Sequence, residues 1–419
     1  MLTLKISVSG LAASRVHACN DAPMRRSAIS AQSWADGLKS AAKRCLLVVS
    51  HPAVVSVNQM VYRELARRDW EVTIVVPSRW RNEYSQAPMF PRALPGMESA
   101  LRPTRVALAG RPQRHIYLTS CRAQCARSRP DVAFIEAEPY SLPASQWGYT
   151  LKRMGVPFGV QCYENIDRDL PLPVRWLRGR VLRDAAFVAA RSESAARLAR
   201  AWGAAGEVDL APPAVPTWEQ LPPRSEHPFT VGYAGRLVES KGLADLLAAV
   251  RALQAPVELL LIGNGEMRAG LEGQPIPGSK VRVLDGLSHE EMPVGYRQLD
   301  VLVLPSHTTA TWKEQFGRVI IEALWCGVPV VGSDSGEIPW LIELTGGGLT
   351  FPEGDVEELA GRLSRLREEP ALRERLAQAG RAAVERLFTV SAATDPLERM
   401  LLRADARRAR GGARPSAPS

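Results

Sequence analysis

Short runs of apolar residues alternate with longer segments of helical spacing through most of the chain. In the N-terminal half, this pattern predicts strands at residues 45–50, 72–77, 131–136, 157–162, 185–190 and 208–211, and a helix at residues 57–68. Runs that are apolar on almost every residue are typical of strands buried on both faces. Their alternation with helices predicts a parallel sheet.

A proline-rich stretch interrupts this rhythm and divides the chain. Residues 212–228 contain Pro212, Pro213, Pro216, Pro222, Pro223 and Pro228, a density that excludes helix and central strand alike. The alternation then restarts, with strands predicted at residues 229–235, 257–263, 281–284, 300–306 and 329–333, and helices at 243–253 and 317–325. The predicted fold class is therefore α/β, with two Rossmann-like, doubly wound parallel-sheet domains facing a cleft.

The predicted domain boundaries follow from these changes of pattern. An N-terminal domain spans residues 44–211, a linker 212–228 and a C-terminal domain 229–386. Residues 387–403 are expected to form a helical segment that returns to the N-terminal domain. Residues 1–43, which are aperiodic, and residues 404–419, rich in Ala, Arg, Gly, Pro and Ser, are expected to be a disordered leader and a disordered tail.

Ligands of such sheets bind beyond the carboxyl ends of the strands, so the loops that follow strands are the expected ligand-binding segments. The loop at residues 235–242 places Arg236 directly after a strand and Lys241 at the start of a helix, an arrangement that suits a diphosphate. Two surface cations in a turn are an equally good interpretation of this loop alone. Residues 263–266 form a Gly-x-Gly turn, which by itself indicates only a tight connection.

The most informative segment is residues 313–333. Glu314 lies in a loop, and Glu322 follows on a helix that is predicted to begin near Gly317. Glu322 lies within the apolar stretch IIEAL, where a carboxylate without a partner would be costly. A carboxylate there suits the paired hydroxyls of a ribose, and an ion pair with a nearby arginine is the structural alternative. Residues 333–339 form a fourth loop after a strand, with N–H groups suited to phosphate.

Together these four loops resemble the donor half of the retaining glycosyltransferases of family 4, which have the GT-B fold. The resemblance covers about residues 229–386. It includes a Glu-x7-Glu signature at Glu314 and Glu322, the Gly-Arg-Leu and Lys-Gly residues of the first loop, and a Gly-Val-Pro-Val-Val strand.

The resemblance implies a role for each residue of these motifs. Arg236 and Lys241 would bind the donor diphosphate and offset charge on the leaving group, and Glu314 would contact the transferred sugar. Glu322 would hold the nucleotide ribose. Gly263 and the turn at residues 284–286 would lie near the base. The N–H groups of Phe316 and Gly317 would lie near the sugar. The remaining donor-site candidates are Gly235, Gly263, Asp285, Gly286, Phe316 and Gly317.

The N-terminal half departs from the family pattern. Members commonly have a Gly-rich loop after the first strand and a histidine after the strand equivalent to residues 131–136, but this chain has SHPAVVSVNQ and IEAEPY there. With the sequence YEN at residues 163–165, it looks like a bacterial subgroup whose acceptors are undefined. The candidates for acceptor binding or acid/base chemistry are Glu136, Glu138, Glu164 and Asn165.

The charge of the chain is concentrated in its N-terminal half. The formal net charge is +9, yet residues 1–210 carry 30 Lys and Arg against 17 Asp and Glu. Such a charge would attract phosphorylated partners or an anionic membrane, and an arginine-rich composition that only solvates the surface explains it equally well. Residues 174–183 have the basic, amphipathic character of an interfacial segment, although a helix packed on the sheet explains them equally well. The scattered cysteines indicate a reducing compartment, so a cytoplasmic protein is expected. The basic half leaves open a peripheral location at the inner membrane face.

The predicted function is transfer of a sugar, with retention of configuration, from a nucleotide sugar to an acceptor hydroxyl of a glycan, a lipid-linked molecule or a small molecule. UDP- and GDP-sugars are the expected donors. They are co-substrates, and no cofactor is expected. No metal is expected either, because no Asp-x-Asp motif lies in a suitable loop. The resemblance implies front-face attack, with the departing phosphate accepting the proton, and no residue is an obvious nucleophile for the covalent route of retaining glycosidases.

Three other classes of protein stay open from the sequence. Another GT-B enzyme, such as an epimerase or a phosphorylase, would share the fold. A non-catalytic nucleotide-sugar-binding protein would keep the donor site, although the presence of both glutamates and both cations argues against it. A nucleic-acid partner would fit the basic half, but no aromatic-basic stacking motif accompanies it, so nucleic acid is not expected.

Overall fold

The computed structural model describes residues 43–411 apart from residues 83–86, 217, 219, 224–226, 254, 273–275 and 277. Side chains are described as far as Arg408. The described residues belong to one compact unit that begins at Lys43. The predicted leader, except Lys43, and the last eight residues of the predicted tail lie outside the described residues.

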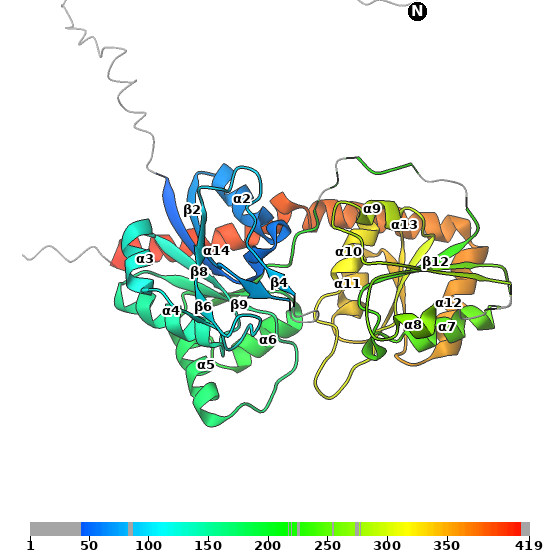
Figure 1. Ribbon diagram of the computed structural model, residues 1–419, viewed down its shortest axis with the longest axis horizontal. Helices are drawn as coiled ribbons and strands as arrows, with labels where there is room; N and C mark the ends of the chain where they lie inside the picture. Colours follow the sequence, from blue (N-terminus) through cyan, green and yellow to red (C-terminus); the bar gives the residue numbers. More distant parts are fainter. Residues whose placement is uncertain are drawn as a thin grey trace, which may run out of the picture. The chain divides into compact units, whose positions relative to one another are not determined.

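The N-terminal half is built on a parallel sheet of seven strands in the order β11-β10-β9-β8-β1-β2-β5 (Figure 1). The strands are β1 (Arg44–Ser50), β2 (Trp70–Pro77), β5 (Leu101–Thr104), β8 (Val132–Glu136), β9 (Phe158–Cys162), β10 (Phe187–Ala190) and β11 (Glu207–Leu210). Their apolar runs are buried on both faces. In β1, Leu46 and Val48 pack into one core while Leu47 and Val49 pack into another. This confirms the two-sided burial that the runs predict.

Helices cover both faces of this sheet. The core that contains Leu47 also includes residues of α3 (Cys121–Ser128), α4 (Leu142–Arg153), α5 (Leu172–Asp184) and α6 (Glu193–Ala201). The opposite core includes residues of α2 (Met60–Arg67) and of α14 (Val390–Gly411). Two short antiparallel hairpins complete this half: β3 (Trp80–Arg81) with β4 (Pro88–Met89), and β6 (Val106–Ala107) with β7 (Ile116–Tyr117).

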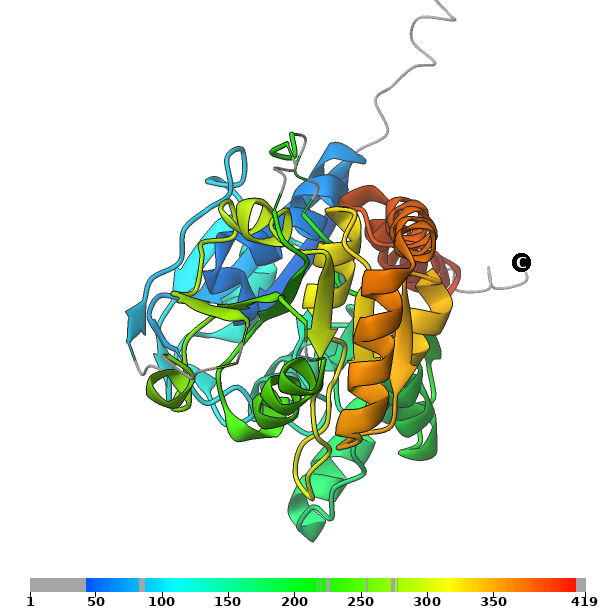
Figure 2. The same ribbon diagram turned by 90° about the vertical axis from the view of Figure 1, so that its right-hand side faces the viewer.

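The C-terminal half has a second parallel sheet, of six strands in the order β14-β13-β12-β15-β16-β17. The strands are β12 (Thr230–Ala234), β13 (Glu258–Ile262), β14 (Lys280–Leu284), β15 (Val301–Leu304), β16 (Val330–Ser333) and β17 (Gly348–Phe351). The helices are α7 (Leu243–Ala252), α8 (Arg268–Leu271), α9 (Met292–Tyr296), α10 (Arg318–Trp325), α11 (Ile338–Thr345), α12 (Val356–Glu368) and α13 (Pro370–Leu387). Helices α7 and α12 lie side by side on one face (Figures 1 and 2).

The two predicted arrays of strands and helices are confirmed, with differences at short elements. The pattern did not predict β5, the two hairpins or β17. Strand β5 carries Pro103 and lies at the sheet edge, the position where a strand tolerates proline. The predicted helix at residues 57–68 begins later, at Met60, after two short 3-10 turns at Pro52–Val54 and Ser56–Gln59. The described residues of 212–228 lie outside helices and strands.

Helix α14 packs against the N-terminal half, as Figure 1 shows. Arg68 donates hydrogen bonds from Nη1 to Asp395 at 2.6 Å and to Glu398 at 2.9 Å. The prediction that the tail begins at residue 404 is wrong, because the helix continues to Gly411. Ala404 is only 3% exposed, so packing against the sheet core holds a segment whose composition suggests disorder. No helix among the described residues has the length and apolar character needed to span a membrane.

Candidate active site

Two glycine turns follow the central strands of the C-terminal sheet and lie in contact. Gly263, after β13, has a φ of +151°, and a Cβ atom there would come 1.8 Å from the carbonyl oxygen of Gly235, after β12. The N–H of Gly235 donates to Ile262 at 3.0 Å, and that of Gly263 to Leu284 at 3.1 Å. Only a residue without a side chain permits this approach at position 263, and at Gly235 a Cβ would come 2.8 Å from the Tyr233 hydroxyl.

The loop after β12 carries the two predicted cations. Arg236 follows Gly235, and its carbonyl oxygen accepts a hydrogen bond from the Tyr233 hydroxyl at 2.6 Å. Lys241 ends a 3-10 turn at Glu239–Lys241, and Gly242 follows it with a φ of +67°. A Cβ at Gly242 would meet the Pro305 carbonyl oxygen at 1.9 Å, so this loop lies directly against the end of β15.

That contact brings Lys241 to Glu314. The Lys241 ammonium donates to Glu314 Oε2 at 2.5 Å, and both side chains are nearly buried. Ser306 Oγ donates to the same carboxylate oxygen at 3.1 Å. The ring of Trp312 lies on the ammonium, with its centroid 4.3 Å from Nζ. An acid and an aromatic ring from one loop therefore position the predicted diphosphate-binding lysine.

The backbone of Glu314 is fixed as firmly as its side chain. Its carbonyl oxygen accepts hydrogen bonds from the N–H of Glu337 at 3.0 Å and from Asn165 Nδ2 at 2.8 Å. Gly336 has a φ of +59°, and a Cβ there would come 2.1 Å from that carbonyl. The predicted fourth loop thus supports Glu314 from behind, and Asn165 reaches it from the N-terminal half.

Glu322 lies on α10, which begins at Arg318 after the predicted start at Gly317. Its side chain is buried, and Oε2 accepts a hydrogen bond from the Tyr296 hydroxyl at 2.8 Å. Burial raises the pKa of Glu322, and the charge of Arg318 and the Tyr296 hydroxyl oppose that rise. Tyr296 therefore supplies a hydrogen-bond partner that the sequence did not indicate, and the charge of Arg318 corresponds to the arginine of the structural alternative.

The remaining donor-site candidates differ in their exposure. Phe316 and Gly317 are buried at the start of α10. Asp285 and Gly286 follow β14 on the surface, where Asp285 Oδ1 lies 2.9 Å from Arg268 Nη1. The Asp285 side chain is 82% exposed, in contrast with Glu314 and Glu322.

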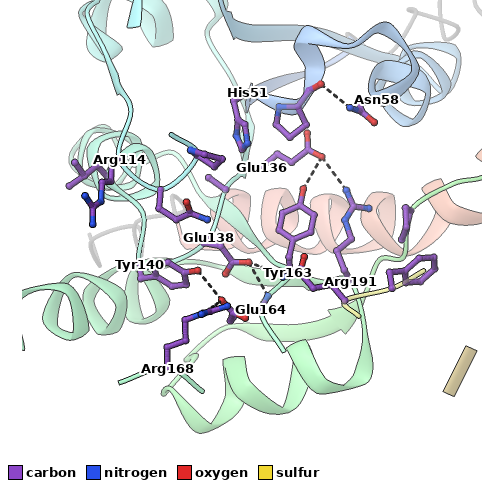
Figure 3. A pocket seen from close by; sticks show the side chains of 18 of the residues that line it. His51, Asn58, Arg114, Glu136, Glu138, Tyr140, Tyr163, Glu164, Arg168 and Arg191 are labelled. Carbon is purple, nitrogen blue, oxygen red and sulfur yellow. Dashed lines mark hydrogen bonds and ion pairs between the residues drawn. The ribbon is translucent and has the colours of Figure 1, made fainter. Parts of the chain in front are cut away.

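A cavity of about 1030 Å³ lies at the carboxyl ends of the N-terminal strands (Figure 3). Glu136, Glu138 and Glu164 line it, together with Gln315, Phe316 and Arg318 from the C-terminal half. Three of the four predicted acceptor-side residues therefore line one cavity, which also reaches the loop of Glu314.

Glu136 is the centre of a buried hydrogen-bond network. Its Oε2 accepts from Ser50 and Tyr62, each at 2.6 Å, and its Oε1 accepts from Arg191 at 3.1 Å and from Tyr163 at 3.3 Å. Figure 3 shows Tyr163 and Arg191 converging on this carboxylate. With both oxygens occupied, Glu136 joins the ends of β1, β8 and β10 and has little capacity left for a ligand.

Glu138 differs from Glu136 in having an oxygen without a partner. Oε1 accepts the backbone N–H groups of Tyr163 at 2.6 Å and Glu164 at 2.9 Å, whereas buried Oε2 has no hydrogen-bond partner among the described residues. Burial raises the pKa of Glu138 to about 8, and the charge of Glu164 adds to the rise while the two N–H groups oppose it. Because Oε1 accepts two hydrogen bonds, the proton of the neutral acid belongs on Oε2.

Glu164 and Asn165 connect the cavity to the donor loops. Glu164 Oε2 accepts from Arg168 Nε at 2.8 Å and from the Tyr140 hydroxyl at 3.2 Å. Arg168 Nη2 also donates to the carbonyl of Thr311 at 2.8 Å, in the loop that carries Trp312 and Glu314. Asn165, which does not line the cavity, binds the Glu314 carbonyl as described above.

Several residues of this region were not predicted from the sequence. His51 directly follows β1 and lines the cavity, and its position after a strand was the signal that could have identified it. Burial lowers the pKa of His51 to about 3 and that of His115, which it contacts at a ring separation of 5.3 Å, to about 4. Both rings are therefore neutral at physiological pH. Trp312, Tyr296 and Arg168 gave no signal, because their importance depends on long-range contacts.

The comparisons with known proteins agree with this division of the chain. The family model "Glycosyl transferase 4-like domain" matches residues 53–214, and the model "Glycosyl transferases group 1" matches residues 216–383. Among curated proteins, the chain is similar to the amylovoran biosynthesis glycosyltransferase AmsK of Erwinia amylovora, with 33% identity over 183 residues, which are 42% of this chain and 45% of that protein. The chain thus matches less than half the length of the first curated relatives.

Solved structures share the fold over most of the chain. Sucrose-phosphate synthase from Thermosynechococcus elongatus is 20% identical with a TM-score of 0.64, covering 87% of this chain and 100% of that one. HepE from Anabaena, solved in complex with UDP, is 16% identical with a TM-score of 0.62, covering 86% of this chain and 100% of that one. The two parallel-sheet domains give the chain a GT-B fold, and the two models together match most of the chain to the glycosyl transferase domains that they describe.

Proposed function

We propose that this protein transfers a sugar from a nucleotide-sugar donor to an acceptor hydroxyl, with retention of the anomeric configuration, in the biosynthesis of a polysaccharide or glycolipid. The observation that carries the proposal is the Lys241–Glu314 pair at the end of β15, nearly buried and only 2.5 Å apart. A cation and a hydroxyl-binding acid held side by side suit the junction of a diphosphate and a sugar.

In this proposal the C-terminal half binds the donor. Lys241 has three N–H donors, and Glu314 uses one of them, so the ammonium retains donors for phosphate oxygens. Arg236, fixed through its carbonyl by Tyr233, adds a second positive charge. Glu322 has one oxygen bound to Tyr296, and its other oxygen is assigned to the ribose hydroxyls. The contacting glycine turns at Gly235 and Gly263 bring the backbone close to the nucleotide.

The transfer step then needs position and charge rather than a covalent intermediate. The acceptor oxygen bonds to the anomeric carbon on the face from which the bond to phosphate breaks. The acceptor proton passes to a departing phosphate oxygen, whose developing charge Lys241 and Arg236 stabilise. Glu314 contacts the sugar hydroxyls and keeps the ammonium in place through their hydrogen bond.

The acceptor is assigned to the cavity lined by Glu138 and Glu164. This cavity reaches Gln315 and Phe316, which adjoin Glu314, so a hydroxyl bound there would be near the transferred sugar. The similarity to AmsK, named for amylovoran biosynthesis, supports a glycan or lipid-linked acceptor, and the UDP complex of HepE supports UDP as the first nucleotide to examine.

A thermal-shift panel of UDP-, GDP- and ADP-sugars tests the donor assignment. A ligand that binds only the folded protein raises its melting temperature, so one nucleotide family should stabilise the protein, and Lys241→Ala should reduce the shift. Lys280→Ala, at an exposed position of β14, is the matched control and should keep the full shift. If no nucleotide sugar stabilises the protein at millimolar concentration, the proposal fails.

Two further measurements test the chemistry. Proton NMR of the product reports the anomeric configuration, and an inverted product would remove the retaining mechanism. Chelator is expected to leave the rate unchanged, because we assign charge stabilisation to Lys241 and Arg236. Loss of activity with chelator that manganese restores would contradict this assignment.

A further inference from the structure

The exposed large apolar side chains of the described residues are unevenly distributed. Most belong to the N-terminal half: Val55, Phe90, Leu108, Ile116, Leu118, Leu142, Tyr149, Leu172 and Trp176. In the C-terminal half they are Val294 and Leu344. Exposed apolar residues that gather in one region, rather than occurring singly, mark a surface that binds something apolar.

Two of these residues line the acceptor cavity, together with further apolar side chains. Leu108 and Leu142 line it, and so do Leu170, Val174 and Leu177 near the start of α5. The same cavity presents Glu138, Tyr163 and Glu164 at the strand ends (Figure 3). One part of the cavity wall is therefore built for hydrogen bonding, and another part is hydrocarbon.

Leu108 has a strained backbone at this position. Its φ is +56°, in the left-handed region that a leucine adopts only at a cost, and its side chain is 51% exposed. Folding stability alone would favour Asn or Gly here. Strained residues that are kept on the surface of a cavity are typical of ligand contacts.

The apolar surface continues beyond the main cavity along α5. Leu172 is 76% exposed and follows Pro171, which lines the cavity. A second cavity of about 160 Å³ lies between α4 and α5 and is lined by Tyr149, Trp176 and Leu177. Leu177 lines both cavities, and Trp176 lines the second one together with the charged Arg180 and Asp184, so Leu177 connects the acceptor cavity to the surface at Trp176.

Resting on the proposed function, we propose that the acceptor is an amphiphile, whose hydroxylated head binds beside Glu138 and whose hydrocarbon chain runs over Leu108, Leu172 and Trp176. The polar part of the cavity fits a sugar or polyol. The chain that continues from it gains stability by leaving water, in proportion to the apolar area that it covers. This use explains why the cavity has both polar and apolar lining residues and why Leu108 and Leu142, two of the exposed apolar residues, line it.

The test is photolabelling with an octyl glucoside that carries a diazirine in its alkyl chain, used below its micelle concentration. Labelled peptides should come from residues 106–118 and 170–184. Unlabelled octyl glucoside should compete at least about tenfold better than methyl glucoside, since about two buried methylenes suffice for that factor.

Two variants and a matched control sharpen the result. Leu172→Ser combined with Trp176→Ser should lower labelling at least about fivefold, and both positions are exposed, so the fold should persist. Leu108→Asn should also lower labelling without loss of stability, because Asn tolerates a positive φ. Val294→Ser with Leu344→Ser removes the exposed apolar residues of the other half and should leave labelling unchanged.

The proposal is overturned if labelling is absent, if it is spread over the protein, or if the variants label like the control. Labelling of α5 that requires lipid vesicles would assign these residues to a membrane surface and would also overturn it. The nucleotide-sugar thermal shift is measured on the same samples. Donor stabilisation without labelling rejects only the amphiphilic acceptor, whereas no donor stabilisation rejects the proposed function itself.

Discussion

The two halves of this protein have related folds but build their candidate sites by different means. In the C-terminal half, glycines at Gly235, Gly242, Gly263 and Gly336 let backbone segments touch, and these contacts place Lys241 beside Glu314. In the N-terminal half, hydrogen bonds between buried side chains hold the strand ends together, and Glu136 accepts them from Ser50, Tyr62, Tyr163 and Arg191. A site built from backbone leaves a recognisable glycine pattern in the sequence, whereas a site built from side chains does not.

The halves also differ in how completely their polar groups are satisfied. In the C-terminal half, Lys241 and Glu314 bind each other, and of the loop behind Glu314 only Glu337 Oε1 is buried without a hydrogen-bond partner among the described residues. In contrast, Glu138 Oε2, His51 Nδ1 and Asn165 Oδ1 are buried without hydrogen-bond partners among the described residues. Such groups carry a cost unless a ligand or water satisfies them. The acceptor side is thus the part of the molecule that is more incomplete without its ligand.

The largest effect, on folding stability and donor binding, is expected from Gly263→Ala, which disrupts the backbone contact between the two glycine turns of the C-terminal half. The new Cβ would lie 1.8 Å from the Gly235 carbonyl oxygen, so the two turns must separate. We expect a loss of more than about 2 kcal/mol in the free energy of unfolding, measured by urea denaturation, and loss of the nucleotide-sugar thermal shift.

Gly278→Ala is the matched control for backbone strain. Gly278 has a φ of +73°, but nothing lies within 4 Å of a Cβ there. Its cost should be limited to about 1 kcal/mol for the left-handed conformation, and donor binding should persist. Equal losses in the two variants would mean that strain, and not the contact of the turns, explains the requirement for glycine.

Lys241→Ala should have the next largest effect, on the rate. Removing the ammonium takes away the charge that stabilises the leaving phosphate, and turnover should fall at least about tenfold, or about 1.4 kcal/mol of barrier. The acceptor KM should change little, because the acceptor is assigned to the other half. Steady-state kinetics with Lys280→Ala as the control measure this, and an unchanged kcat would remove Lys241 from the site.

Glu138→Gln tests the acceptor half through pH. The neutral acid and the amide both place an oxygen toward the two N–H groups and a donor at the other position. At pH 7 the variant should therefore stay within about threefold of the wild type. Above the folded pKa of about 8, the wild-type acid ionises, and its kcat/KM for the acceptor should fall about tenfold per further pH unit while that of the variant stays level.

The same ionisation affects stability with a defined sign. The pKa of Glu138 is higher in the folded state than its ordinary value of 4.5, so the folded protein binds the proton more tightly. This contribution to stability is fully present below about pH 4.5 and is lost as pH rises to about 8. The stability of the wild type relative to Glu138→Gln should fall over this range in urea denaturation.

The activity of the same variant gives the contrary outcome. If Glu138→Gln is inactive at pH 7, Glu138 acts as an ionised base.

Much of the fold was predictable because buried parallel strands leave continuous apolar runs. The predicted strand at residues 131–136 is β8, and that at residues 257–263 is β13. Strand β5 escaped because four residues with a proline leave no such run, and the end of α14 escaped because its stability comes from packing on a distant sheet. The local pattern of apolar and polar residues predicts a helix or strand only where the residues of that segment, and not distant contacts, determine its structure.

The candidate site divides in the same way. The resemblance assigned Lys241 and Glu314 to one donor site, and it could be recognised because the glycine loops and the Glu-x7-Glu spacing are local signals. It could not rank Glu136 against Glu138, which stand two residues apart, because their difference lies in partners such as Tyr62 and Arg191. Those partners are supplied by other elements of the fold.

Substitution of Trp312 should have the smallest effect on donor binding. Trp312 is a side chain that supports Lys241 in the half whose candidate site is otherwise arranged by backbone contacts. Its ring centroid lies 4.3 Å from Lys241 Nζ, and a turn holds the residue in place, because the backbone N–H of Trp312 donates to Thr309 Oγ1 at 3.0 Å. A cation–π contact of this exposure contributes about 0.5–1 kcal/mol, so Trp312→Leu should raise the donor KM about two- to fivefold. Trp312→Phe, which keeps a ring, should recover most of that loss. If Leu and Phe variants weaken donor binding equally, Trp312 only fills space, and the lysine is positioned by Glu314 and Ser306 alone.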